Sequence, residues 1–288
     1  MIAISGLTKR YRDVLAVDEL SLEVPSGSVC GLLGRNGAGK TTTFKCLLGF
    51  ARPDRGSVRF DGAPLAPQTF AKLGYVPERP ALYHWLTVAQ HLELARRTQP
   101  AYDRSRAEEL LATFRLDGRK KAGRLSKGQQ TALALIFALA ARPSILLLDE
   151  PASGLDPVLQ RVVLDLLIDA AANGAAILLS SHQIGQIDRA ADRVAIMRDG
   201  KVVVSGELDA LRESSRVVEA TFAGTVPDLG ELAAMKLEQI GTNVRIHANG
   251  RAEAVAARCG ALGAVGVRVL DRSLEDIFLD AVDDGGNR

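Results

Sequence analysis

The residues best suited to chemistry form a glycine-rich turn that ends in a lysine and a threonine, Gly34–Thr41. Their order is Gly-x-x-x-x-Gly-Lys-Thr, between an apolar run that predicts a buried strand and a pattern that predicts a helix. Glycines have no Cβ atom, so the backbone can curl until several N–H groups face one anion. Lys40 would then reach the β- and γ-phosphates of a nucleoside triphosphate, and the Thr41 hydroxyl would ligate Mg²⁺. The flanking strand and helix favour this phosphate-binding loop, or P-loop, over a chance glycine-rich turn.

Two carboxylates follow a second apolar run. Ile145–Leu148 predicts a strand buried on both faces, and Asp149 and Glu150 stand at its carboxyl end, the edge where open α/β sheets collect ligands. We expect Asp149 to hold Mg²⁺ and Glu150 to act as general base for the attacking water. His182 follows a further buried strand, 175–179. A lone histidine is more often structural, but this position makes it a candidate sensor of the γ-phosphate.

Length and composition describe a globular chain. It has 288 residues, of which 47% are hydrophobic and 24% charged, and its formal net charge of +2 gives no electrostatic reason to expect a nucleic-acid partner. Its three cysteines are odd in number and show no pairing pattern, which is typical of a reducing compartment. No signal peptide is visible, and the longest apolar run, 132–141, is far shorter than the roughly 20 residues of a membrane span. We therefore expect any action on a membrane to pass through a partner.

The order of predicted elements indicates an α/β fold in two domains. Strands and helices alternate to about residue 212, and helical patterns concentrate in a subdomain at about 85–141. Within it, Ser126 stands where the N-cap of an apolar helix, 131–141, belongs. Residues 213–288 predict a small α/β domain without a catalytic cluster. Its expected strands are 217–222, 244–247 and 265–270, and its expected helices 251–262 and 273–282.

Together, these motifs resemble those of the nucleotide-binding subunit of an ABC transporter. The matching segments are Gly34–Thr42 for Walker A, Ile145–Glu150 for Walker B, Leu125–Gln129 for the signature, Ser153–Asp156 for the D-loop and His182 for the switch histidine. Tyr11 stands where the family has an aromatic residue that stacks on adenine. The segment Ser273–Phe278 resembles the accessory domain of ATPases in the export-type, ABC-2-like branch, which serve small two-component systems.

The resemblance implies a fold, an activity and partners. The fold would be a P-loop NTPase core of the ABC type, with a mixed sheet and a helical subdomain, over 1–212, followed by a small α/β accessory domain. The activity would be ATP hydrolysis coupled to transport through a separate integral membrane permease, reached by way of the region 79–97. The chain would be cytoplasmic and peripheral on the cytoplasmic face of the cell membrane. No nucleic acid is implied, and selection of the cargo would lie mainly in the permease.

The resemblance also implies a dimer of ATPase subunits, either homo- or heteromeric, that meets head to tail. Each ATP would lie between Walker A of one subunit and the signature of the other. Expected ATP contacts are Tyr11, Gly34, Asn36, Gly37, Ala38, Gly39, Lys40, Thr41, Thr42, Ser126, Gly128 and Gln129. Expected metal ligands are Thr41, Glu78 and Asp149, and expected catalytic residues are Glu150 and His182.

Two positions depart from the family pattern. The usual signature is Leu-Ser-Gly-Gly-Gln, and Lys127 here replaces its first glycine. The lysine either adds positive charge near the γ-phosphate or points to solvent. The usual glutamine of the Q-loop is Glu78, which can ligate Mg²⁺ but cannot donate an amide hydrogen bond. Neither change removes Lys40, Asp149 or Glu150, so we expect an active ATPase.

Two other classes of protein remain as alternatives. An ABC-type ATPase acting on ribosomes or DNA usually carries two cassettes or long coiled-coil arms, whereas this chain has one cassette and no heptad runs. A P-loop kinase of a small metabolite would need neither the segment Leu125–Gln129 nor His182. The sequence therefore favours the transporter subunit over both.

Overall fold

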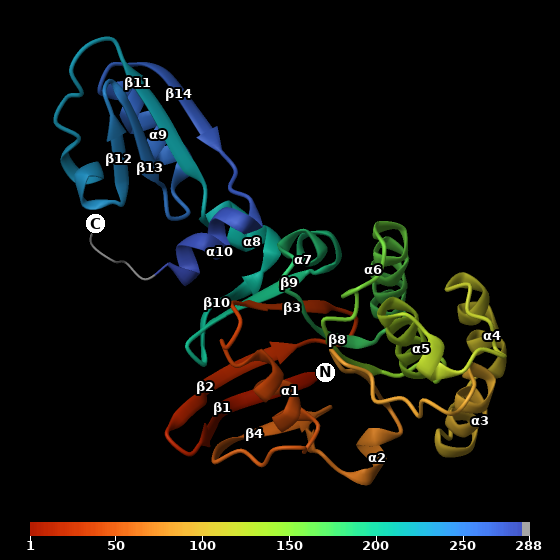
Figure 1. The fold of residues 1–288 in the computed structure, drawn as a ribbon. Helices are drawn as coiled ribbons and strands as arrows, with labels where there is room; N and C mark the ends of the chain where they lie inside the picture. The colour runs from red at the N-terminus through yellow and green to blue at the C-terminus, as the bar shows by residue number, and fades with distance from the viewer. Residues whose placement is uncertain (284–288) are drawn as a thin grey trace. The chain divides into compact units, whose positions relative to one another are not determined.

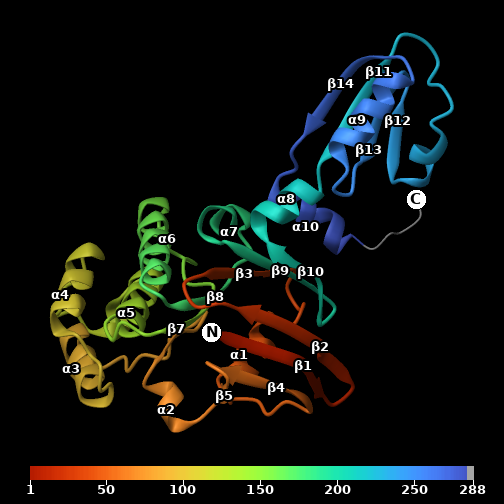
Figure 2. The same ribbon diagram turned by 180° about the vertical axis from the view of Figure 1, so that it is seen from behind.

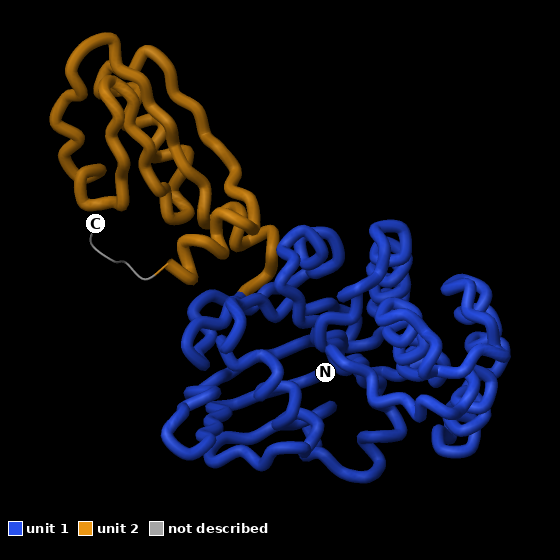
Figure 3. The backbone as a smooth tube through the Cα atoms, in the orientation of Figure 1, with its two compact units in different colours: residues 1–205 blue, residues 206–288 orange. Residues whose placement is uncertain are grey.

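The computed structural model describes residues 1–283 and divides into two compact units, 1–205 and 206–288 (Figure 3). The division precedes a short helix, α8 (Leu208–Ser214), whereas the sequence predicts a domain boundary at about residue 212, within that helix. None of the helices within residues 1–283 has both the length and the apolar character that a membrane crossing requires.

The first unit contains two sheets (Figure 1). One is antiparallel, with order β2-β1-β4-β5, and its strands are β1 (Ile2–Tyr11), β2 (Val14–Val24), β4 (Arg55–Phe60) and β5 (Ala63–Pro64). The other has six strands in the order β10-β9-β3-β8-β7-β6, and the four pairings from β9 to β6 are all parallel. Its strands are β3 (Val29–Gly34), β6 (Leu73–Val76), β7 (Ile145–Asp149), β8 (Ala176–Ser180), β9 (Arg193–Arg198) and β10 (Lys201–Glu207).

The two sheets share a hydrophobic core. The helix α1 (Lys40–Leu47) contributes the fully buried Phe44 and Leu47, which belong to one cluster with Leu20 of β2 and Leu147 of β7. On the other side of the six-stranded sheet lie α6 (Pro157–Ala172) and α7 (Ile184–Ala190). Since parallel strands covered on both faces read as continuous aliphatic runs, the buried segments β7 and β8 could be predicted from sequence. The predicted α/β fold with a mixed set of strands is confirmed.

Three helices form a separate cluster beside the sheets (Figure 2). They are α3 (Val88–Thr98), α4 (Arg104–Thr113) and α5 (Lys127–Leu139), and shorter turns of helix occur at α2 (Pro67–Phe70) and η1 (Ala122–Arg124). Ser126 is the N-cap of α5, as expected: its Oγ accepts from Gln129 N at 3.2 Å, and Gln129 Oε1 accepts from Ser126 N at 3.2 Å. The apolar body of α5 packs against α4 and β6.

The second unit is an antiparallel four-stranded sheet with helices. Its order is β12-β13-β11-β14, and its elements are β11 (Val217–Phe222), β12 (Leu237–Ile240), β13 (Asn243–His247), β14 (Ala264–Leu270), η2 (Gly230–Ala234), α8, α9 (Ala252–Ala261) and α10 (Leu274–Val282). Val255 and Cys259 of α9 pack on Val218 and Ile246 in its core. The sequence predicted every strand of this sheet except β12. Residues 284–288, the end of the expected second domain, lie outside the described part of the chain.

Candidate active site

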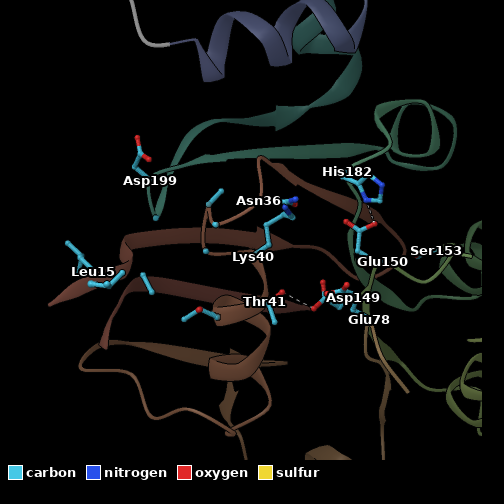
Figure 4. A pocket seen from close by; sticks show the side chains of 17 residues that line it. Leu15, Asn36, Lys40, Thr41, Glu78, Asp149, Glu150, Ser153, His182 and Asp199 are labelled. Carbon is cyan, nitrogen blue, oxygen red and sulfur yellow. Dashed lines mark hydrogen bonds and ion pairs between the residues drawn. The ribbon is translucent and has the colours of Figure 1, made fainter. Parts of the chain in front are cut away.

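A cavity of about 710 Å³ opens where β3, β7 and β8 end (Figure 4). Its walls are residues 14–16, 36–42 and 199–200, together with Glu78, Asp149, Glu150, Ser153 and His182. The P-loop, both carboxylates at the end of β7 and the histidine after β8 are thus brought together, because β3, β8 and β7 are neighbouring parallel strands whose carboxyl ends meet at one edge.

The P-loop wraps tightly around the start of α1. Gly39 has a φ of +106°, and a Cβ atom added there would lie 2.4 Å from the carbonyl oxygen of Ala16, so only glycine fits. The buried Lys40 reaches back across the loop, and its Nζ donates to the carbonyl oxygens of Gly34 at 2.6 Å and Arg35 at 3.3 Å. The ammonium therefore lies at the concave side of the loop, where an anion would sit.

Burial lowers the pKa of Lys40, while the negative charges of Glu150, Asp149 and Glu78 act to raise it. The carboxylates thus favour the cationic form that a phosphate needs. Glu78 lies on the same wall as Asp149 in Figure 4, at the side of the cavity opposite Leu15.

The side chain of Asp149 is held by two hydroxyl groups. Thr41 Oγ1 donates to its Oδ2 at 3.1 Å, and Ser180 Oγ donates to its Oδ1 at 2.5 Å. Mg²⁺ prefers oxygen ligands such as hydroxyl and carboxylate groups, so Thr41 and Asp149 suit that ion. Among residues 1–283 no group of three or more His, Cys, Asp and Glu side chains could hold a metal ion by itself. A bound Mg²⁺ would accordingly depend on phosphate oxygens and water for its remaining ligands.

Glu150 occupies an unusual backbone conformation that aims its carboxylate into the cavity. Its φ is +54°, and its N–H donates to Ser180, to the carbonyl oxygen at 3.1 Å and to Oγ at 3.2 Å. His182 Nδ1 lies 2.7 Å from Glu150 Oε2. Burial raises the pKa of Glu150, against the lowering effects of His182 and Lys40. A partly buried carboxylate with a hydrogen-bonded histidine can accept a proton from water.

The signature residues stand apart from this cavity. Ser126, Gly128 and Gln129 lie at the start of α5 and do not line it, and Ser126 and Gln129 close the capping box described above. Tyr11 also lies outside the lining. It is 43% exposed, with Lys9 Nζ 5.2 Å from its ring centroid, and the aliphatic segment 14–16 forms the nearby wall instead.

Ser180 has no predicted role, although its Oγ donates to Asp149 Oδ1 and accepts from Glu150 N. The signal was its position directly after the aliphatic run of β8, because the register pairs Asp149 with Ser180 across neighbouring parallel strands.

Comparisons with known proteins find similar sequences. The family model of the ABC transporter matches residues 17–153. The chain is 37% identical over 219 residues to the uncharacterized ABC transporter ATP-binding protein YhaQ of Bacillus subtilis (strain 168), covering 74% of each chain. It is 32% identical over 296 residues to the daunorubicin resistance ATP-binding protein DrrA3 of Streptomyces coeruleorubidus, covering 98% of this chain and 94% of that protein. It is also 32% identical to the Nod factor export ATP-binding protein I of Sinorhizobium fredii (strain NBRC 101917 / NGR234), over 96% of this chain and 84% of that protein.

Solved structures of ATP-binding cassettes are similar to this chain as well. A structure of the ATP-binding subunit of an ABC transporter superimposes with a TM-score of 0.68 and 31% identity, covering 74% of this chain and 92% of that one. A dimeric post-hydrolysis state of the ATP-binding cassette MJ0796, bound to ADP and Pi, superimposes with a TM-score of 0.66 and 25% identity, covering 72% and 99%.

Proposed function

This chain belongs to the family of ABC transporter ATP-binding proteins, and from that premise we propose how its residues bind and hydrolyse ATP. It is the ATP-binding and ATP-hydrolysing subunit of an ABC transporter. One observation carries the residue assignment: Lys40 of the P-loop, the pair Asp149 and Glu150 at the end of β7, and His182 after β8 converge on one cavity.

The P-loop binds the triphosphate of ATP. Its N–H groups and the positive end of the α1 dipole face the phosphates, and the Lys40 ammonium exchanges its bonds to Gly34 and Arg35 for phosphate oxygens. The assigned phosphate contacts are Gly34, Asn36, Gly37, Ala38, Gly39, Lys40, Thr41 and Thr42. For adenine we keep Tyr11 as the candidate, with the aliphatic wall at 14–16 beside it.

Thr41, Asp149 and Glu78 would hold Mg²⁺, which when bound neutralises charge on the phosphate oxygens. Glu150 then accepts the proton of the water that attacks the γ-phosphate. His182 holds the Glu150 carboxylate by its ring N–H and lies at the same end of the cavity. The positive φ of Glu150 is consistent with this assignment, because strained backbone is concentrated at functional sites.

A second ATPase subunit completes the site. Ser126, Gly128 and Gln129 have no role in the cavity of their own chain, yet they begin a buried 13-residue helix whose positive end suits an anion. In a head-to-tail pair, each ATP lies between the P-loop of one subunit and this helix end of the other. Binding of ATP closes the pair, and loss of the γ-phosphate opens it.

The partner in the membrane is an integral permease, and an apolar groove supports its placement. The groove, about 520 Å³, lies between the segment 77–83, α3 and α5, and Phe50 and Tyr75 help to line it. Tyr83 of this lining is 49% exposed, and the neighbouring Trp85, whose ring centroid lies 5.3 Å from that of Tyr83, is 67% exposed. Glu78, which lines the ATP cavity, belongs to this same segment, so the groove is suited to pass the motion of the site to the permease. We accordingly place the chain on the cytoplasmic face of the membrane.

The export-type, ABC-2-like branch is our proposal for the kind of transporter. It is supported by the two relatives named for daunorubicin resistance and for Nod factor export, whose alignments run through both units of this chain. In this assignment the second unit, 206–288, is the accessory domain of that branch.

Affinity purification from detergent-solubilised membranes tests the partner. The native chain should be recovered with an integral membrane protein, and the double variant Tyr83→Ser/Trp85→Ser should lose it. Phe70→Ser, which changes an exposed aromatic residue of α2 outside the groove, is the matched control. Recovery with ribosomes or DNA in place of a membrane protein would contradict the proposal.

A further inference from the structure

A lysine joins the start of α5 to the turn that follows Glu150. Lys127 is the first residue of α5, and its Nζ donates to Ser153 Oγ at 3.1 Å. Ser153 lines the ATP cavity of the same chain, as do Glu150 and His182. This hydrogen bond thus links α5, whose first residues lie outside the cavity, to the cavity wall.

The backbones on either side of this bond are in direct contact. A Cβ atom added to Gly128 would lie 2.5 Å from the carbonyl oxygen of Gly154, and one added to Gly154 would lie 3.2 Å from Cδ and 3.3 Å from Cγ of Lys127. The stem of the lysine therefore rests on Gly154 while its ammonium reaches Ser153. Movement of the start of α5 would therefore displace the turn that contains Ser153 and Gly154.

The turn that contains Ser153 begins at Glu150, the proposed general base. Ser153 N donates to the carbonyl oxygen of Glu150 at 3.0 Å, and Glu150 itself has the positive φ described above. A shift of Ser153 would therefore displace Glu150, whose positive-φ conformation has to be stabilised by neighbouring residues.

We propose that Lys127 is a positioning residue that couples the start of α5 to the turn Glu150–Ser153 of its own chain. ATP bound to the second subunit contacts the start of α5 through its γ-phosphate. Lys127 couples that contact to the position of Glu150. Catalysis at one ATP thereby depends on occupancy of the other. The inference rests on the proposed head-to-tail pair, because only there does α5 meet a second ATP.

Steady-state ATP hydrolysis, measured as kcat, half-saturating ATP and Hill coefficient, tests the coupling. Lys127→Met keeps the stem over Gly154 and removes the ammonium, and Ser153→Ala removes the acceptor. Each should lower kcat several-fold and bring the Hill coefficient toward 1, and the double variant should add nothing to either single change. Lys127→Arg keeps a donor and should restore both quantities. Lys72→Met, which removes an exposed lysine at the amino end of β6, is the control and should leave them unchanged.

ATP-dependent pairing in the Glu150→Gln background separates this proposal from its rivals. Lys127→Met should pair at the same ATP concentration as its parent. If Lys127→Met needs tenfold more ATP to pair, the Lys127 ammonium contacts the ATP of the second subunit directly. That result would refute the coupling through Ser153 but would leave the proposed head-to-tail pair intact. Additive effects of Lys127→Met and Ser153→Ala, or no effect of either, also refute it. If Glu150→Gln itself does not form ATP-dependent pairs, the proposed head-to-tail arrangement is wrong. The present inference, which depends on that arrangement, is then wrong as well.

Discussion

His182 Nδ1 lies 2.7 Å from Glu150 Oε2, across the ends of two neighbouring parallel strands. The carboxylate side chain is only 13% exposed, whereas the imidazole is 56% exposed. The histidine is therefore the solvent-facing member of the pair, and its ring nitrogen contacts one oxygen of the less exposed carboxylate.

Replacement of His182 should slow hydrolysis without preventing ATP binding. His182→Ala removes a hydrogen bond to a charged group, worth about 1.5–3 kcal/mol, which corresponds to a fall in kcat of roughly 10- to 150-fold. Phosphate release under saturating ATP measures it, and His182→Gln, which keeps an N–H donor, should retain more activity. If His182→Ala keeps more than about half of the native rate, the histidine does not orient the base.

The pH dependence of hydrolysis should reflect the burial of Glu150. Burial raises the pKa of this carboxyl above its ordinary value. A general base acts only when ionised, so kcat should fall as the pH drops through this raised pKa and should level off above it. The fall should begin at a higher pH than an exposed glutamate would give. In His182→Ala it should move higher still, because the histidine lowers the pKa of Glu150.

Measurement of kcat between roughly pH 5 and pH 8 tests this, with circular dichroism at each pH to exclude unfolding. A rate that remains level down to the ordinary pKa of an exposed glutamate would contradict the assignment of Glu150 as a buried base.

Most of the site could be predicted from the sequence because its parts are local. Gly34–Thr41 and Ile145–Glu150 each contain a strand, its end and the reactive residues within a few positions, and parallel pairing then brings the strand ends together. The Ser126 cap was equally local, since its partner Gln129 lies three residues on. Such patterns need no knowledge of the rest of the fold.

What the sequence did not predict depends on contacts between distant segments. The bonds from Ser180 to Asp149 and from Lys127 to Ser153 require the strand register and the helix packing, which no local pattern encodes. The strand β12 was missed because three of its four residues are exposed, so it lacks the alternation of a half-buried strand. Tyr11 matches the family position by sequence, yet it lies outside the cavity lining.

Ser180→Ala should weaken Mg²⁺ binding. The change leaves Asp149 Oδ1 without its buried donor, so the apparent Mg²⁺ affinity should fall about 10- to 100-fold and stability by about 1–3 kcal/mol. The concentration of Mg²⁺ that gives half-maximal hydrolysis measures the first effect, and urea unfolding the second.

The neighbouring Ser181→Ala is the matched control, because this buried hydroxyl donates to Gln186 Oε1 and does not contact Asp149. It should lower stability without changing the Mg²⁺ requirement. If both variants need the same Mg²⁺ concentration, Ser180 does not support a metal site.

Glu78→Gln tests the second departure from the family pattern. The carboxylate lines the same cavity as Asp149, and its loss should raise half-maximal Mg²⁺ about 3- to 10-fold while hydrolysis at saturating Mg²⁺ is retained. Titration with Mg²⁺ measures the change, with Glu23→Gln, an exposed residue of β2, as the control. An unchanged Mg²⁺ requirement would show that Glu78 is not a ligand of the ion.

The central claim is that each ATP is held between two ATPase subunits, and Glu150→Gln tests it most directly. This variant should bind ATP without turning it over, because the amide cannot accept the proton of the attacking water. Light scattering after size exclusion should then show pairs in ATP and Mg²⁺, and single chains in ADP or when Lys40→Ala is added. Single chains at saturating ATP, with neither a second copy nor a supplied sister subunit recruited, would contradict the account.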